Sequence, residues 1–191
     1  MAKEKKEDIT RFIVQDRMSG EFSTDVLHRK CFDVNIRLMG TSEGYSKLVM
    51  SVVRYMRDIL MREYSNYPEV KGISGANIGI PFNIIGMRIK SKPAAPPFLL
   101  IDGINGTTFM INPKIVEKST RTKVLKSNCG SIRLEKSIKV IRPEWIRIEF
   151  HNMNLIKETH KIDGYLGFTI QHEVEHNLGI LITDKEVYED A

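Results

Sequence analysis

The 191-residue chain has few cysteines, only Cys31 and Cys129, and it has no apolar run as long as a membrane-spanning helix. Two cysteines do not make a disulfide framework, so a reducing compartment is expected. A helix that crosses a bilayer needs about 20 predominantly apolar residues, which excludes an ordinary transmembrane helix. The first residues, MAKEKKED, place no apolar stretch behind their charges, which is atypical of a secretory signal. The sequence therefore predicts a soluble, cytoplasmic protein with no membrane partner.

The sequence also lacks internal repeats, low-complexity tracts and a strong excess of one charge. Its 29 Lys and Arg exceed its 24 Asp and Glu by five, and these charges are scattered along the chain. Such a mild excess is typical of a solvated basic surface and does not by itself indicate a nucleic-acid partner. Apolar residues make up 41% of the chain, which is enough for a core. Length and composition together predict a single domain over residues 1–191.

Hydrophobic periodicity predicts two helices. One is expected to begin after a cap at Thr41 or Ser42 and to reach about Tyr64, because its apolar residues recur at helical spacing. The second is expected over residues 164–178, where apolar residues lie four apart. Gly179 then follows at the position where a helix end favours glycine.

The region between these helices predicts short strands. Segments that are rich in β-branched residues, or that alternate apolar with charged residues, are 83–89, 98–101, 109–111, 138–141, 145–150 and 155–162, with 115–126 continuing in extended form. A surface loop is expected at 91–97, SKPAAPP, since proline lacks a backbone donor. We therefore expect an α+β fold in which short antiparallel strands pack around the C-terminal helix, with an additional N-terminal helix.

The second helix carries the sequence His172-Glu173-Val174-Glu175-His176. Residues four apart lie on one helical face, so both imidazoles can bind one metal ion. Glu173 lies beside the first histidine but is turned away from direct ligation, which places it to take a proton from a metal-bound water. A chance pair of surface histidines on an amphipathic helix is the alternative interpretation.

The motif alone leaves the third metal ligand open. The position six residues beyond His176, which is a histidine in one metalloprotease layout, is Ile182. Glu186 and Glu189 are expected to lie too close to the helix end to fold back onto the metal. The third ligand is therefore expected upstream, where the candidates are Cys31, Cys129, His28, His151 and His160.

Cys129 stands out among these candidates because small and polar residues surround it in segment 127–131. Such a segment lets the backbone approach an ion, and a thiolate with two imidazoles suits Zn²⁺ or Fe²⁺. Cys31 and its neighbour His28 are interpreted as lying outside the metal site, since a lone cysteine is more often an inert, half-buried thiol.

Three separated motifs resemble those of the peptide deformylases, which remove the formyl group from the N-terminal formylmethionine of new bacterial and organellar proteins. Residues 171–179, QHEVEHNLG, resemble the family's Q-H-E-x-D-H-x-x-G. Residues 127–131, SNCGS, resemble E-G-C-L-S, and residues 72–79, GISGANIG, resemble G-L-A-A-P-Q-I-G. The resemblance covers roughly residues 48–184.

The resemblance implies a metal site and its substrate. Cys129, His172 and His176 fall on the family's metal ligands, which implies one divalent ion. The family suggests Fe²⁺, although Zn²⁺, Ni²⁺ or Co²⁺ suits the same ligands. A formylmethionyl peptide is the implied substrate, and the ribosome is a further expected partner.

The resemblance also assigns catalytic and substrate-binding roles. Glu173 is the implied proton carrier. Asn77 falls on the family's glutamine, and Gly130 falls on the leucine whose backbone N–H faces the developing oxyanion. Gly72 is expected to border the substrate and to pair with its backbone, as a peptide added to a sheet edge would.

The sequence departs from the family within these motifs. Asn77 is one methylene shorter than glutamine, and Glu175 stands in place of the usual aspartate. Ser127 replaces a glutamate, which removes a carboxylate near the metal helix and an ion pair with an arginine such as Arg142. These changes leave open a deformylase-like metal-binding protein with weak or no activity. A zinc-type peptidase is another alternative, which the upstream cysteine and the absence of a third ligand after His176 disfavour.

Overall fold

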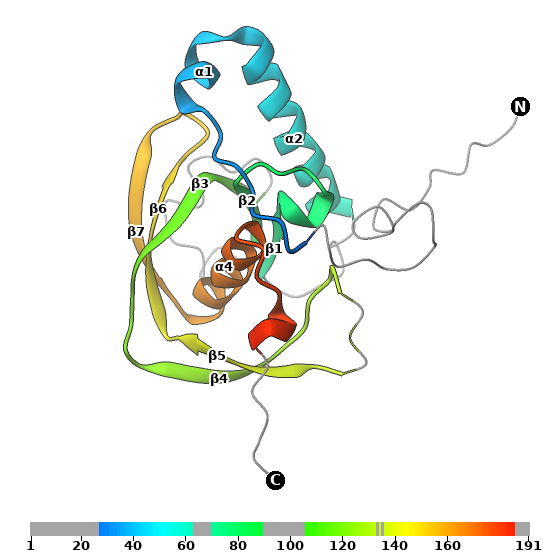
Figure 1. Cartoon of the computed structure of the whole chain (residues 1–191). Helices are drawn as coiled ribbons and strands as arrows, with labels where there is room; N and C mark the ends of the chain where they lie inside the picture. Colours follow the sequence, from blue (N-terminus) through cyan, green and yellow to red (C-terminus); the bar gives the residue numbers. More distant parts are fainter. Residues whose placement is uncertain (1–26, 63–69, 90–105, 133, 135, 186–191) are drawn as a thin grey trace, which may run out of the picture.

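The computed structural model describes residues 27–62, 70–89, 106–132, 134 and 136–185, which form an α+β fold (Figure 1). The helices are α1 (Ile36–Thr41), α2 (Glu43–Arg62) and α4 (Gly164–Asn177), with short 3-10 turns η2 (Ala76–Ile78) and η4 (Ile182–Lys185). The strands are β1 (Val70–Ser74), β2 (Ile84–Ile89), β3 (Thr107–Lys118), β4 (Thr122–Ser127), β5 (Ile138–Pro143), β6 (Trp145–His151) and β7 (Lys157–Asp163). The predicted fold class is therefore confirmed.

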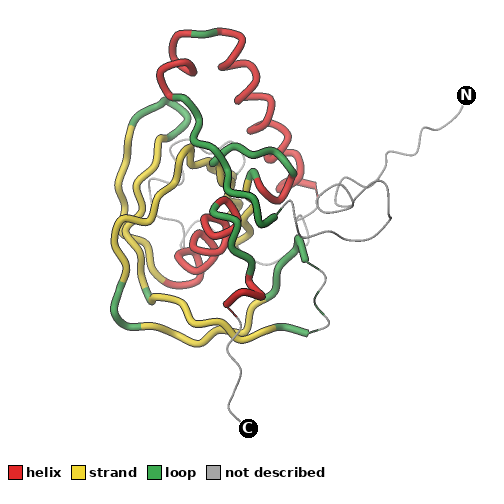
Figure 2. The backbone as a smooth tube through the Cα atoms, in the orientation of Figure 1, coloured by secondary structure: helices red, strands yellow, loops and turns green. Residues whose placement is uncertain are grey.

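Antiparallel pairing joins these strands into two sheets. The larger sheet has the order β1-β2-β3-β6-β7, and the smaller one pairs β4 with β5. β1 therefore forms one edge of the larger sheet, with β2 as its neighbour. Figures 1 and 2 show the strands curving around α4, so that this helix lies in the interior of the fold.

Two apolar clusters hold the larger sheet between α2 and α4. Successive side chains of a strand point to opposite faces of the sheet. Ile84 and Phe109 accordingly pack with the buried face of α2, whereas Ile85 and Met110 pack with that of α4. Burial on both faces fixes the register of β2 and β3, because a slip of one residue would exchange the two sets of side chains. The sheet is thereby a firm support for α4.

The two predicted helices are confirmed with small changes at their ends. α2 covers Glu43–Arg62, while the expected end near Tyr64 lies outside the described residues, and the Ser42 hydroxyl accepts a bond from the Tyr45 backbone N–H at 3.4 Å. α4 ends at Asn177, and Gly179 has a φ of 76°. A β carbon at Gly179 would also lie 2.3 Å from the His28 carbonyl oxygen, so the position requires glycine on both grounds. In the described residues, no helix combines the length and the apolar character that crossing a bilayer requires.

The strands differ from prediction in three places. The segment 109–111 lies near the start of the longer strand β3, and the expected continuous extension over 115–126 is broken between β3 and β4. At this break Ser119 donates its hydroxyl to the Arg121 carbonyl and its backbone N–H to the Trp145 carbonyl, so a local and a tertiary contact together hold the turn. β1 and α1 were not predicted at all. The expected loop at 91–97 and strand at 98–101 lie outside the described residues.

Candidate metal centre

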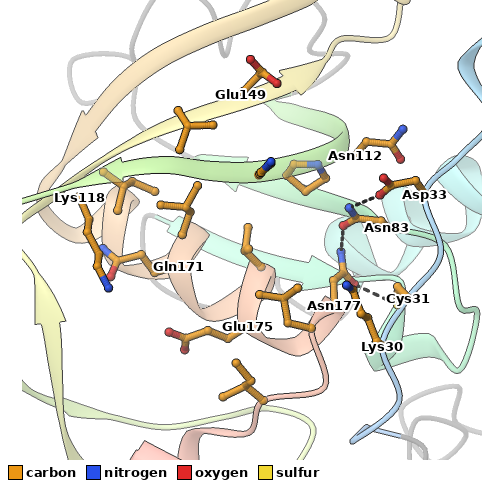
Figure 3. A pocket seen from close by; sticks show the side chains of 18 of the residues that line it. Lys30, Cys31, Asp33, Asn83, Asn112, Lys118, Glu149, Gln171, Glu175 and Asn177 are labelled. Carbon is orange, nitrogen blue, oxygen red and sulfur yellow. Dashed lines mark hydrogen bonds between the residues drawn. The ribbon is translucent and has the colours of Figure 1, made fainter.

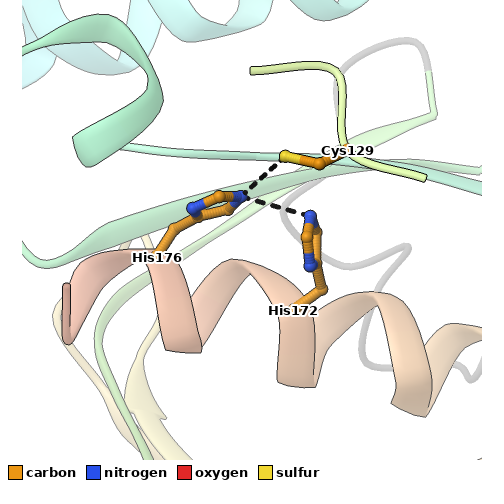
Figure 4. A group of neighbouring side chains, drawn as sticks. All are labelled: Cys129, His172 and His176. Atoms are coloured by element: carbon orange, nitrogen blue, oxygen red, sulfur yellow. Dashed lines mark hydrogen bonds between the residues drawn. The ribbon is translucent and has the colours of Figure 1, made fainter. Parts of the chain in front are cut away.

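Cys129, His172 and His176 bring three potential ligand atoms together (Figure 4). The two histidines lie one turn apart on α4, with 3.2 Å between their Nε2 atoms, and Cys129 Sγ lies 3.3 Å from Nε2 of His176. All three atoms lie within 4.8 Å of one another. A tetrahedral ion bound by two imidazoles and one thiolate separates these atoms by about 3.3–3.6 Å, given the usual zinc–ligand distances. The geometry therefore suits a single metal ion.

Burial prepares the two imidazoles for metal binding. It lowers the pKa of His176 to about 4, with a further contribution from the Arg142 guanidinium. Burial likewise holds the pKa of His172 well below its ordinary value, with His176 and Arg142 adding to the effect. Both rings are consequently neutral at pH 7, and the neutral imidazole is the form that ligates a metal.

The Cys129 thiol, unlike the two imidazoles, is not in its metal-binding protonation state in the metal-free protein. Burial raises its pKa to about 11, although hydrogen bonds from Ser131 act in the opposite direction. A thiol of this kind would become a ligand by losing its proton to the solvent as the metal binds, so metal binding is coupled to proton release. Loss of affinity at low pH follows from the same coupling.

Glu173 is buried beside the two histidines and faces β1. A β carbon built on Gly72 would lie 2.5 Å from Glu173 Cγ and 2.7 Å from its Oε1, so only glycine leaves room for this carboxyl. Burial raises the pKa of Glu173 to about 8, and the positive charges of Arg142 and Lys71 counteract this rise. Within the described part of the chain, Glu173 Oε2 is buried without a hydrogen bond. Such an atom is suited to bind a water or a substrate group.

Asn77, in η2, is held from two sides. Its Oδ1 accepts bonds from the backbone N–H and the hydroxyl of Ser74, both at 2.7 Å. Its Nδ2 donates to the Ser131 hydroxyl at 2.7 Å, across the 54 positions that separate these two residues. The amide thus connects the first motif to the cysteine motif.

All seven site residues predicted from the sequence line one small cavity. Its lining consists of Gly72, Ile73, Asn77, Cys129, Gly130, Ser131, His172, Glu173 and His176. Ile73 and Ser131 are the two members that the sequence did not single out as site residues. No signal in the sequence sets Ile73 apart, and Ser131 is marked there only as a small neighbour of Cys129.

The remaining candidates for a third ligand lie elsewhere. Cys31 is buried and its thiol bonds Asn177 Oδ1 at 3.4 Å, while His28 Nδ1 lies 3.9 Å from an Asp184 carboxylate oxygen. His160 Nε2 contacts Glu158 at 2.7 Å, and His151, the last residue of β6, lies outside the group of potential ligands. Among the residues that the structure describes, only Cys129 joins the two helix histidines in a group that could hold a metal.

Arg142 on β5 lies next to the Nδ1 side of the His172 ring. Its Nη1 lies 2.8 Å from Glu175 Oε2, and its Nη2 lies 3.5 Å from His172 Nδ1. Ser127 does remove a carboxylate from its own position, as expected. Arg142 nevertheless keeps a carboxylate partner, because Glu175 supplies one from α4.

A larger groove, of about 1110 Å³, lies on another side of α4 (Figure 3). Gln171, Glu175 and Asn177 line it from the helix, and residues of β3 such as Lys118 face them. Inside it a chain of hydrogen bonds runs from Asp33 through Asn83 to Asn177. None of the seven predicted site residues lines this groove, so its size does not make it the catalytic site.

Comparison with known proteins gives a consistent result. The family described as polypeptide deformylase matches residues 20–190 of this chain. A peptide deformylase of Wolbachia pipientis from Culex pipiens is 33% identical over 121 residues, which is 63% of this chain and 66% of that protein. A peptide deformylase of Afipia carboxidovorans is 30% identical over 150 residues, covering 78% of this chain and 80% of that protein.

The fold comparison agrees with the sequence comparison. A crystal structure of peptide deformylase from Plasmodium falciparum is similar with a TM-score of 0.64 and 26% identity, over 85% of this chain and 81% of that one. The chain thus spans just under two thirds of the Wolbachia relative and larger shares of the other two proteins. Because the family match extends over nearly the whole sequence, the chain belongs to the polypeptide deformylase family.

Proposed function

We propose that this protein is a metal-dependent hydrolase that removes the N-terminal formyl group from formylmethionyl peptides. The observation that supports this most directly is the cavity in which Cys129, His172 and His176 converge beside the buried carboxyl of Glu173. Those residues provide a metal site and a proton carrier in contact with the same small space. Family membership supplies the reaction that such a site would perform.

We assign the metal to Cys129, His172 and His176, in the form of one divalent ion. Fe²⁺ is our first choice, and Zn²⁺, Ni²⁺ and Co²⁺ are compatible with the same one-sulfur, two-nitrogen set. When bound, the ion supplies a water of lowered pKa and polarises the formyl oxygen. These three residues would hold the ion and would leave it accessible to that water.

Glu173 moves the proton in this proposal. Its carboxylate accepts a proton from the attacking water while the water oxygen bonds the formyl carbon. The protonated carboxyl then gives that proton to the amine nitrogen as the C–N bond breaks, which releases formate and a free N-terminus. The positive charge of Arg142 favours the carboxylate form, and a bound cation would favour it further.

The oxyanion and the peptide have separate contacts. We assign the backbone N–H of Gly130 to the developing oxyanion, and Asn77, whose amide bonds Ser131, lies in the same cavity to support that group. Gly72 lies on β1, whose outer edge has no strand partner among the described residues. An extended peptide can add to such an edge through backbone hydrogen bonds, which would bring its N-terminus to Glu173.

A protein with weak activity is the second candidate. The amide of Asn77 is engaged by Ser74 and Ser131, so it is not free to turn toward a substrate. A deformylase-like metal-binding protein therefore remains the alternative. The upstream thiolate continues to disfavour a zinc-type peptidase. The single domain over 1–191, the ribosome as a partner and the cytoplasm as the location stay predictions.

Formate release from formyl-Met-Ala-Ser tests the proposal. The protein is purified without oxygen, loaded with Fe²⁺ or, in parallel, with Ni²⁺, and metal content is measured by elemental analysis. We expect catalytic turnover that depends on the metal and is absent with acetyl-Met-Ala-Ser. One equivalent of metal without formate release would contradict deformylase activity and favour the binding-protein alternative. Cleavage of an internal peptide bond would favour the peptidase.

A further inference from the structure

The orientation of the Asn77 amide is determined by its own loop. The Ser74 backbone N–H can only donate, so the amide atom that it meets at 2.7 Å must be the oxygen. The nitrogen is consequently the atom that faces Ser131. Asn77 is buried, with an exposed fraction of 4%, and its short side chain cannot turn without breaking both of its bonds to Ser74.

The hydroxyl of Ser131 receives the Asn77 N–H and keeps its own proton for another bond. A hydroxyl has one donor and two acceptor sites, so accepting from Asn77 leaves its O–H to donate, either to the adjacent Cys129 thiol or to a group in the cavity. Accepting a hydrogen bond also polarises the O–H and strengthens it as a donor. Ser131 lines the same cavity as Glu173 and Gly130 and is only partly buried there.

The backbone of Ser131 is fixed as well. Its N–H lies 3.4 Å from Cys129 Sγ, which ties it to the cysteine that we assign to the metal. A donor held at both its backbone and its hydroxyl needs little reorganisation when charge develops nearby, which is the condition for strong oxyanion stabilisation.

We propose that the Ser131 hydroxyl, polarised by Asn77, is a catalytic donor to the formyl oxygen. In this arrangement Asn77 is a positioning residue, and its effect on the reaction passes through Ser131. Two short side chains in series would thus perform the task that one longer amide performs in relatives with a glutamine at position 77. The inference rests on the proposed deformylase function.

Turnover of three variants tests the relay. Removal of one oxyanion donor lowers turnover by roughly a hundred- to a thousand-fold, so we expect Ser131→Ala to lower kcat by about that factor with KM and metal content nearly unchanged. Ser131→Thr, which keeps the hydroxyl, should retain most of the rate. Ser51→Ala, at an exposed serine on α2, is the matched control and should leave kcat unchanged.

A double-mutant cycle shows whether Asn77 acts through Ser131. If it does, Asn77→Ala combined with Ser131→Ala should be no slower than Ser131→Ala alone, because the relay is already broken. If the double variant instead lowers kcat by the product of the two single factors, Asn77 reaches the oxyanion directly, which would overturn the proposal. A Ser131→Ala rate within about three-fold of wild type would overturn it too.

Two spectroscopic measurements do not depend on activity. Ser131 could act instead on the Cys129 thiolate, in which case Ser131→Ala would shift the thiolate-to-cobalt charge-transfer band of Co²⁺-loaded protein. We expect that band to stay in place. Formate titrated into the Co²⁺ protein should bind at least ten-fold more weakly to Ser131→Ala than to wild type.

The formate titration also separates the two proposals. If wild type releases no formate from the peptide, the proposed function fails, but weaker formate binding by Ser131→Ala would still support Ser131 as a donor into the cavity. Equal formate affinity in the two proteins, or no formate binding by wild type, would contradict the role of Ser131.

Discussion

Arg142 and Glu175 form a buried ion pair, with 2.8 Å between Arg142 Nη1 and Glu175 Oε2. These two atoms form no aligned hydrogen bond, so charge rather than hydrogen-bond geometry holds them. Lys185 in η4 contacts the other oxygen of Glu175. The Arg142–Glu175 pair thereby joins β5 to α4 beside His172, and Lys185 joins η4 to the same carboxylate.

Removal of the Glu175 charge should be strongly destabilising. Glu175→Gln leaves the fully buried Arg142 guanidinium without its carboxylate, and breaking a buried pair in this way costs about 3–5 kcal/mol. Glu149→Gln removes one partner of the more exposed Lys157–Glu149 pair and should cost at most about 1 kcal/mol. Urea unfolding of both variants measures the difference, and equal losses would contradict the importance of the buried pair.

Replacement of Gly72 by alanine should disable the site. The new β carbon would lie 2.5 Å from Glu173 Cγ, so the carboxyl must move away from the cavity. We expect formate release to fall by at least about a hundred-fold, as expected when a general acid–base group is displaced. Gly44→Ala, at a helical position with open space around it, should keep full activity and be up to about 1 kcal/mol more stable. Near-normal turnover in Gly72→Ala would show that Glu173 tolerates displacement.

The parts of the fold that depend on local pattern were predicted from the sequence. The periodicity of α4 and the spacing of His172 and His176 are properties of one helix, so the sequence contains them. β1 was not predicted, because Gly72 weakens its strand propensity and its pairing with β2 is a tertiary interaction. The same limit applies to the break between β3 and β4, which depends on the contact of Ser119 with Trp145.

The side-chain contacts within the site are harder still to predict from the sequence. The resemblance placed Asn77 near the oxyanion, but it could not show that Ser74 and Ser131 hold the amide. That depends on how η2 meets a loop far along the chain. Likewise, the sequence suggested that Ser127 removes an ion pair, while the longer side chain of Glu175 supplies Arg142 with another.

The two cysteines should differ in their effect on metal binding. Cys129→Ala removes one of three converging ligand atoms, so we expect it to lose most of the bound metal. Cys31→Ala should keep the metal, because the Cys31 thiol bonds Asn177 and lies outside the ligand group. Elemental analysis after dialysis measures both. Full metal content in Cys129→Ala would refute the ligand assignment.

Glu173 should make the metal-free protein less stable as pH rises. Burial raises its pKa from an ordinary 4.5 to about 8, so between these values the folded state holds a proton that the unfolded state has released. Unfolding is then favoured progressively from about pH 4.5, and the full penalty, on the order of a few kcal/mol, is present above about pH 8. Glu173→Gln carries no ionisable group and should lack this decline.

The Glu173→Gln variant should therefore be more stable than wild type at pH 8.5 and similar to it at pH 5 when metal is removed. Urea unfolding at the two pH values measures this, with Glu43→Gln as a control at an exposed glutamate of α2. Because a bound cation favours the carboxylate, the metal-loaded wild type should show a smaller decline. In the same preparations Glu173→Gln should keep its metal and release no formate, since an amide cannot accept the proton of water. A Glu173→Gln protein that loses stability with pH as steeply as wild type would show that Glu173 is ionised in the metal-free fold.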